Sequence, residues 1–421
     1  MFKKIDSFFL YLLLLGLFFF KIPSFYIIPF FKNPFTTSQA LARIFVVLVF
    51  CFHIIDHFFT KNSLVFKKQA KLPVNLIILL FVIQSLTILV SINSIDFLSR
   101  YKDIIIAFLA FFDFYFYKKY LREIAIVLLF SIVINACYQS IIVFYQDFFV
   151  RYLSNFIYQK HVDLVISKLQ NNKIYTDTYD EILIPLLFVF PFKTNLVKNL
   201  ALYVFSIFIT FFSFVSNIRS RVLMLFISVA GSLIEFKKVS LKTIFVITFS
   251  VLVVGFLINN VMNYVIGYSF VDRLILQDQL TDVKPINSRL NQIQNALEMG
   301  SSNWLGVGLG NYYDNLNSTQ KDVITTINRS LYTADQSAQE FVHNVFGAVL
   351  AESGYISLIV FLAILIIFAR DDLALLKTGS EFQKAYVIAF WSLFSYGLFN
   401  PISTASYQVL FWGIRGLLLE P

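Results

Sequence analysis

Residues 7–20 read Ser-Phe-Phe-Leu-Tyr-Leu-Leu-Leu-Leu-Gly-Leu-Phe-Phe-Phe, an uncharged run that comes soon after the basic pair Lys3 and Lys4. A helix needs about 20 mostly apolar residues to cross the hydrocarbon core of a bilayer, and this stretch stays mostly apolar as far as residue 29. The basic start is similar to that of a secretory signal, but no small-residue cleavage site follows the run. We therefore expect the first segment to be an uncleaved membrane span.

The rest of the chain repeats this composition. Of 421 residues, 58% are hydrophobic and only 14% are charged, and Phe alone occurs 51 times. Soluble domains carry about 25% charged residues, so a soluble globule could not cover this much apolar surface. The same figures exclude disordered, coiled-coil, collagen-like and disulfide-rich secreted proteins. We expect an all-α polytopic membrane protein with about twelve spans, at 7–29, 40–60, 74–92, 101–117, 121–148, 181–195, 198–217, 221–236, 242–266, 343–369, 383–400 and 404–419.

Breaks rich in basic residues alternate along the chain with breaks that carry few. Lys and Arg gather in the cytoplasmic loops of membrane proteins, and here every second break carries a basic cluster while the short breaks between them carry few. The alternation predicts that both termini are cytoplasmic. The chain has 34 Lys and Arg against 25 Asp and Glu, and the alternation explains this excess of positive charge by the orientation of the protein in the bilayer. We therefore expect no nucleic-acid partner. The clusters are Lys3 and Lys4; Lys61, Lys67, Lys68 and Lys71; Lys118, Lys119 and Arg122; Lys193 and Lys198; Lys237, Lys238 and Lys242; and Arg370, Lys377 and Lys384.

The expected organisation has three parts. Residues 1–266 hold spans one to nine, residues 267–342 form an external loop, and residues 343–421 hold spans ten to twelve. The loop is the one sizeable hydrophilic block of the chain, and its acidic residues outnumber its basic residues. It far exceeds the ~12–15 residues beyond which loops are usually functional or disordered. We expect it to fold over the outer face of the bundle.

One helix is predicted inside this loop. Its apolar face is marked by residues at steps of four, three and four, which are Ile286, Leu290, Ile293 and Leu297. Asn287 or Ser288 is suited to cap its start, and Gly300 to end it. Arg289, near the first turn, is either a solvated surface arginine or is directed at an anionic ligand.

Two more arginines, Arg219 and Arg221, stand at the outer junction of the seventh and eighth spans, against the general alternation. Basic side chains at a helix end can extend to the lipid headgroups. A guanidinium pair also suits a diphosphate, because arginine binds phosphate oxygens in bidentate fashion. Both interpretations place the two residues at the outer face of the membrane.

Further features lie close to the start of the tenth span. Gly306, Gly308 and Gly310 predict a turn that allows two backbone segments to approach closely. They do not form a nucleotide loop, because no strand precedes them and no Lys-Ser/Thr pair follows. His343, followed by Asn344, stands where the acidic loop meets the membrane. A lone histidine is more often structural, but one at a helix entrance beside water is well suited to proton transfer near neutral pH.

The acidic residues suggest no metal site. The external loop has no Asp-x-Asp or Asp-Asp pair, and its acids are spread without the spacing of metal ligands. Asp371-Asp372 lies beside Arg370 in a predicted cytoplasmic break, where we expect a solvated helix end. Glu352 lies inside a span, where a carboxylate is costly unless it is paired or hydrated, and it is a candidate for locking helices together. We expect neither a metal nor another cofactor.

Taken in order, these motifs resemble the signature of the O-antigen ligase superfamily, which also contains many oligosaccharide polymerases. The resemblance covers roughly residues 200–370, and the first 200 residues contribute only hydropathy. The matching segments are Ser220-Arg221-Val-Leu-Met-Leu, Asn287-Ser-Arg289-Leu, Trp304-Leu-Gly-Val-Gly-Leu-Gly-Asn311, His343-Asn344 and Leu350-Ala-Glu352-Ser-Gly354. Each is short, and the match depends on their order, spacing and shared membrane side.

The resemblance implies a metal-independent, inverting glycosyltransferase at the outer face of the bacterial inner membrane. The donor would be a glycan on undecaprenyl diphosphate, and the acceptor a sugar hydroxyl of lipid A–core or of another glycan. Arg289 and one of Arg219 and Arg221 would hold the diphosphate leaving group. His343 would accept the proton of the acceptor hydroxyl or orient that hydroxyl. The glycine turn, Asn344 and Glu352 would support the site.

Two other functions are compatible with the sequence. A repeat-unit polymerase of the same superfamily differs only in its acceptor, which is another lipid-linked glycan. A polysaccharide flippase or other transporter would carry ionisable residues near the membrane midplane and paired, interrupted helices in two halves. Here the notable charges gather at one face, and no internal repeat is detected.

The alternation of basic clusters makes a direct prediction about topology. Reporter fusions at Lys238 and at Asn315 should report opposite sides of the membrane, with Lys238 cytoplasmic and Asn315 external. Two fusions that report the same side would overturn the topology and the shared outer face of the site residues.

Overall fold

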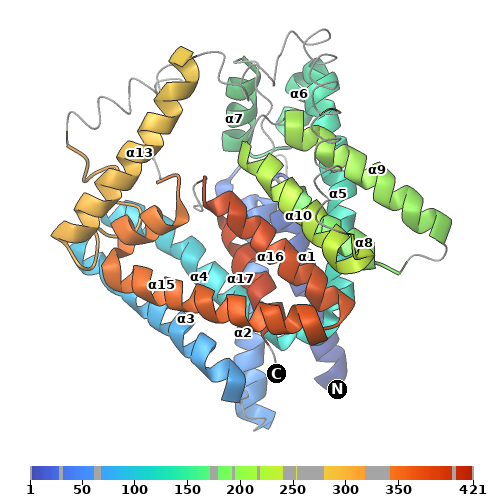
Figure 1. Ribbon diagram of the computed structural model, residues 1–421, viewed down its shortest axis with the longest axis horizontal. Helices are drawn as coiled ribbons and strands as arrows, with labels where there is room; N and C mark the ends of the chain where they lie inside the picture. The colour runs from blue at the N-terminus through green and yellow to red at the C-terminus, as the bar shows by residue number, and fades with distance from the viewer. Residues whose placement is uncertain are drawn as a thin grey trace.

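The described part of the chain is helical, with isolated β-bridges and no strand, in a computed structural model (Figure 1). The structure describes residues 2–27, 32–60, 68–170, 179–191, 195–215, 219–239, 253, 279–317, 342–400 and 404–419. The longer helices are α1 (Phe2–Lys21), α2 (Ser38–Thr60), α3 (Lys68–Leu86), α4 (Ser94–Phe116), α5 (Leu121–Phe144), α9 (Asn195–Val215), α10 (Arg219–Lys237), α13 (Gln279–Ser302), α15 (Val345–Thr378), α16 (Glu381–Gly397) and α17 (Ala405–Leu418). The shorter elements include α6 (Gln146–Arg151), α7 (Gln159–Gln170), α8 (Ile184–Val189) and the 3-10 turn η5 (Asp180–Leu183).

The helices have the composition of membrane spans. Among the described residues, four helical segments are long and apolar enough to cross a bilayer, and they are Ser38–Phe58, Ala70–Val90, Lys118–Phe144 and Val345–Thr378. Large apolar side chains such as Ile207, Ile359 and Ile366 point outward, whereas several charged side chains are buried between helices. Such a surface would be costly in water and is favourable in lipid. The protein is therefore a helical membrane protein.

Polar contacts sort the helix ends into two faces of the bundle. At the terminal face, Asp6 near the start of the chain pairs with Lys119 at 3.7 Å, and Lys118 Nζ donates to the carbonyl of Leu419 at 3.3 Å. Glu235 pairs with Lys384 at the same face, at 2.7 Å. Figure 1 accordingly shows the start of α1 and the end of α17 close together.

The opposite ends meet at what we call the loop face. At this face the segment after α3 contacts the turn after α13. The segment between α1 and α2 contacts the segment after α6, and α10 contacts the end of α16. Residues that define this face are Asn93, Asn311, Ser220, Asn344 and Asn400. Among the described residues, the contacts of the terminal face involve Lys118, Lys119 and Lys384 of the basic clusters. Which face is cytoplasmic stays a prediction.

The count of about twelve spans stays a prediction, and two of the expected spans are not seen as continuous helices in the described residues. The sixth, at 181–195, is wrong as a continuous helix, because Pro185 stands in the first turn of α8, which ends at Val189 before the Phe190-Pro191 pair. A six-residue helix is only about 9 Å long and cannot cross a bilayer. The ninth, at 242–266, lies outside the described residues apart from residue 253.

The expected solvated end at Asp371-Asp372 is only half correct. Asp371 pairs with Arg370 in the open, but Asp372 is buried and pairs with Arg415 of α17 at 2.6 Å. The Trp391 indole donates to the other carboxylate oxygen of Asp372 at 2.8 Å. Asp372 turns inward because it lies one position further around the helix, where α16 and α17 pack. This ion pair ties α15 to α17 near the terminal face.

Helix α15 is kinked at Gly354, where the backbone has φ 75° and ψ −178°. The turn that follows α13 contacts this kink directly. A Cβ atom at Gly354 would lie 1.9 Å from the carbonyl oxygen of Trp304, and one at Gly306 would lie 2.5 Å from that of Ala351. Both positions also have positive φ, which only glycine adopts without strain. The two glycines therefore allow backbone to pack on backbone at the loop face.

Substitution of the glycine at this kink should strongly destabilise the fold. Gly354→Ala should lower the free energy of unfolding by about 3 kcal/mol or more, because it adds both a clash and a positive-φ penalty. Thermal unfolding in detergent, followed by circular dichroism, would measure the loss.

The matched control is Gly16→Ala in α1, where the added Cβ would sit 3.5 Å from Ala42 and Phe45. Alanine favours a helix over glycine by about 1 kcal/mol, so this variant should keep or raise the midpoint. Equal stability of the Gly354 and Gly16 variants would show that the backbone contact contributes nothing.

Candidate functional site

The helix predicted within residues 267–342 exists, and it is longer than the expected one. α13 begins at Gln279 and ends at Ser302, so neither Asn287 nor Ser288 caps it and Gly300 lies inside it. Gly300 instead packs against Leu350 of α15.

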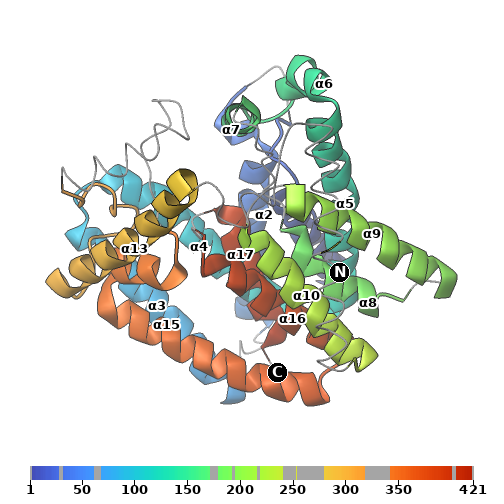
Figure 2. The ribbon, with the colours of Figure 1, turned by 45° about the horizontal axis from the view of Figure 1, so that its top comes forward.

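The face of α13 that meets the bundle carries mainly polar and small residues, including Gln292, Asn295 and Ala296. Leu290 and Leu297 of the predicted apolar face point outward, with Leu290 60% exposed. The spacing predicted an apolar face but not its direction, because an apolar stripe beside a membrane can face outward as well as inward. Figure 2 shows α13 lying against the first part of α15.

Gln292 reaches the start of α15. Its side-chain oxygen accepts the backbone N–H of His343 at 3.0 Å. The next residue, Asn344, caps α15 by accepting the N–H groups of Phe346 at 2.9 Å and Gly347 at 3.0 Å. The backbone position of His343 is thus held from both sides, at a partly exposed helix entrance on the loop face.

The glycine turn positions Glu352. The N–H of Gly308 donates to the backbone carbonyl of Glu352 at 3.1 Å, and the N–H of Gly310 hydrogen-bonds to its carboxylate. The same carboxylate pairs with Arg100 of α4 at 3.7 Å, and both side chains are buried. A charged pair away from water holds its geometry only where further hydrogen bonds support it. Glu352 was expected to need a partner, and that partner is Arg100. The hydrogen bond from Gly310 in the glycine turn further stabilises the carboxylate.

Arg221 is buried and paired. Its Nε lies 2.6 Å from Glu181 of η5, and only 2% of the Arg221 side chain is exposed. Ser213 of α9 donates to the same carboxylate oxygen. The structure describes the backbone alone at the other two predicted arginines, Arg219 at the start of α10 and Arg289 in α13, so their side chains lie outside the described residues.

A second buried pair stands beside the first. Lys21, at the end of α1, lies 3.1 Å from Asp180, whose carboxylate also accepts the side-chain amide of Asn135 at 2.9 Å. Asp180 and Glu181 are consecutive, so one short turn carries two carboxylates that pair with one cation from the start of the chain and one from its middle. The close like charges are tolerable because each has its own cation.

Hydrogen bonds connect the arginine-bearing end of α10 to the histidine-bearing end of α15. The side-chain amide of Asn400, just beyond α16, donates to the hydroxyl of Ser220 next to Arg221. The amide of Asn344 donates to the carbonyl of Leu398 at 3.0 Å. The C-terminal end of α16 thus bridges the two motifs. The segments at Ser220-Arg221, Gln292 and His343-Asn344 are assembled at one face.

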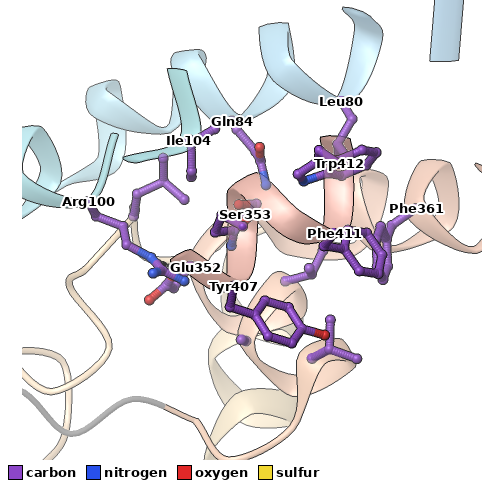
Figure 3. A pocket seen from close by; sticks show the side chains of 15 residues that line it. Leu80, Gln84, Arg100, Ile104, Glu352, Ser353, Phe361, Tyr407, Phe411 and Trp412 are labelled. Carbon is purple, nitrogen blue, oxygen red and sulfur yellow. Dashed lines mark ion pairs between the residues drawn. The ribbon is translucent and has the colours of Figure 1, made fainter. Parts of the chain in front are cut away.

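Two cavities open near these residues. The smaller lies between α5 and α9 and is lined by Ile132, Ala136, Gln139, Asp180, Phe208, Ile209, Phe212 and Arg221. The larger lies between α3, α4, α15 and α17 (Figure 3). At one of its ends are Arg100 and Glu352, and at the other are Phe361, Phe411 and Trp412. No group of His, Cys, Asp and Glu within the described ranges is arranged to hold a metal ion.

Several residues of this face escaped the sequence-based prediction. Arg100 falls in a break between two predicted spans and Glu181 is the first residue of another, and neither was singled out as a site residue. Their burial is visible only once distant helices are packed together. Gln292 carried no signal, because a glutamine on a polar helix looks solvated. The one available clue was that ionisable residues next to a span are costly unless paired.

No family model matches the chain, and no curated protein matches it. The functional inference therefore depends on the short motifs and on the way the fold assembles them.

The Glu181–Arg221 pair predicts a non-additive effect on stability. Glu181→Leu and Arg221→Met should each cost about 3–5 kcal/mol, because each leaves one buried charge without its partner. The double variant Glu181→Leu with Arg221→Met should cost less than either single change, because it removes both charges and keeps the volume. Unfolding in mixtures of mild detergent and dodecyl sulfate measures all three.

The exposed pair of Arg370 and Asp371 provides the control. Arg370→Gln should change stability by less than about 0.5 kcal/mol. Additive costs in the double variant would mean that Glu181 and Arg221 do not depend on one another.

Proposed function

We propose that the protein transfers a glycan from undecaprenyl diphosphate to a sugar hydroxyl of lipid A–core at the outer face of the bacterial inner membrane, as O-antigen ligases do. One observation carries the proposal. Segments that resemble the ligase motifs, far apart in the sequence, are joined at one face by the contacts of Asn400 with Ser220, Asn344 with Leu398, and Gln292 with His343. This convergence supports the proposal, because a transferase needs its donor-binding and acceptor-binding groups at one face.

The arginines have different roles in this proposal. Arg221 is already neutralised by Glu181, so its part is to hold the start of α10 in position. Arg219 and Arg289 hold the diphosphate of the donor. Negative charge grows on the diphosphate as it leaves, so fixed guanidinium groups there stabilise the transition state more than the ground state.

His343 acts on the acceptor. The acceptor oxygen attacks the anomeric carbon of the donor sugar while the bond from that carbon to the diphosphate oxygen breaks. The proton of the acceptor hydroxyl passes to the His343 imidazole, and the diphosphate leaves with its electron pair on the lipid. Gln292 and Asn344 fix the backbone around His343, so the ring starts from a defined position. Cleavage of the glycosyl–diphosphate bond drives the reaction, and no nucleotide is consumed.

The test is a transfer assay with purified protein, lipid-linked donor and lipid A–core, without nucleotide and in excess EDTA. Wild-type protein should form product under these conditions. His343→Ala should lower the rate by a factor of about 100 or more with donor binding largely unchanged. Arg289→Lys should weaken donor use, because lysine lacks the planar fork that matches a phosphate.

Asn315→Ala, on the same loop, serves as the matched variant and should transfer at the wild-type rate. Activity that disappears in EDTA and returns with Mg²⁺ would replace the arginine mechanism by a metal site. Wild-type transfer by correctly inserted His343→Ala would remove the histidine from the reaction. Product formed only with a second lipid-linked repeat as acceptor would identify a polymerase instead.

A further inference from the structure

The larger cavity contains groups for which the proposed transfer has no use. It is bounded by Leu80 and Gln84 of α3, by α4, by α15 and by the start of α17. Figure 3 shows Gln84 and Ser353 near the Arg100–Glu352 end, and Phe361, Phe411 and Trp412 grouped at the other end. The cleft is thus polar at one end and aromatic at the other.

Ser353 is the most informative residue of this cleft. Its side chain is 0% exposed, and within the described part of the chain its hydroxyl has no hydrogen-bond partner. A buried hydroxyl in a helix normally donates a hydrogen bond to a carbonyl one turn earlier. A buried hydroxyl that lacks any hydrogen bond costs about 1–3 kcal/mol of stability. The residue that follows is Gly354, where the helix kinks. Ser353 therefore lines the cleft, and its buried hydroxyl has unused bonding capacity.

The charges of the cleft restrict what could bind there. Arg100 and Glu352 neutralise one another at 3.7 Å, and the turn at Gly310 further satisfies the carboxylate. An anionic headgroup would have to compete with Glu352 for the arginine, and a cationic one would meet Arg100. Both would lose solvation in a buried site. A neutral hydroxyl can bond to Ser353 and to the amide of Gln84 without disturbing the ion pair.

We propose that this cleft binds a lipid with an uncharged hydroxyl end group, of the long-chain alcohol class. The hydroxyl bonds to Ser353 and Gln84, and the hydrocarbon chain lies against Phe361, Phe411 and Trp412. Clefts of this kind, mostly apolar with a few convergent polar groups, are the usual form of small-ligand sites. The site does not depend on the proposed function, because it uses neither the arginines assigned to the diphosphate nor His343.

The probe is hexadecanol with a photoactivatable diazirine in its chain, added to the purified protein in mild detergent. After irradiation, mass spectrometry should locate the label on the segments of α15 and α17 that line the cleft. Excess unlabelled hexadecanol should suppress this labelling, whereas hexadecyl phosphate at equal concentration should not. Stronger competition by the phosphate, or label that avoids these segments, would overturn the proposal.

Variants then test the hydroxyl. Ser353→Ala should lower labelling at limiting probe by about fivefold, the value of one hydrogen bond, and Ser353→Leu should abolish it by filling the space. Ser357→Ala is the control, because Ser357 is equally buried and equally without a partner in the described residues but does not line the cleft. Unchanged labelling of Ser353→Ala and Ser353→Leu would refute the assignment. If either variant unfolds, the competition on wild-type protein decides alone.

Discussion

The fold depends on a single turn in which two carboxylates that are neighbours in the sequence are both removed from water. Asp180 binds Lys21 from the start of the chain, and Glu181 binds Arg221 from the middle. Either acid without its cation would be strongly unfavourable at this depth. The turn therefore fixes α1 and α10 relative to one another, and through Ser220 and Asn400 it also fixes the end of α16. The geometry of the loop face follows from these pairings.

Two further buried pairs act in the same way on α15. Arg100 and Glu352 hold it to α4 near the loop face, while Arg415 and Asp372 hold it to α17 near the terminal face. Helices in lipid gain little from apolar packing against one another, since the lipid tails are equally apolar. Charges and close backbone contacts therefore specify which helices meet. The kink of α15 at Gly354 belongs to this scheme, because it brings the helix backbone within reach of the turn after α13.

Much of the helix pattern could be predicted from hydropathy, because apolar runs of sufficient length have few alternatives to a membrane helix. α2 and α10 begin and end within two residues of the expected 40–60 and 221–236. Side-chain orientation was harder to foresee. Periodicity showed that α13 has an apolar face but not that Leu290 points away from the bundle. Glu352 could be recognised as needing a partner, but Arg100 lies 252 positions earlier (352 − 100) and only the packed helices bring them together.

The pairing of Lys21 with Asp180 has a consequence for biosynthesis. The two residues are separated by 159 positions, so α1 leaves the ribosome and enters the membrane long before its acidic partner has been made. In that interval the lysine can extend to the headgroup region, as long basic side chains near a helix end do. Until η5 has been made, Lys21 lacks this acidic partner, so the pairing that holds the end of α1 forms only after that point. Translation of residue 180 would supply the partner that fixes the end of α1, whereas Glu181 would wait for Arg221 before α10 could be held in place.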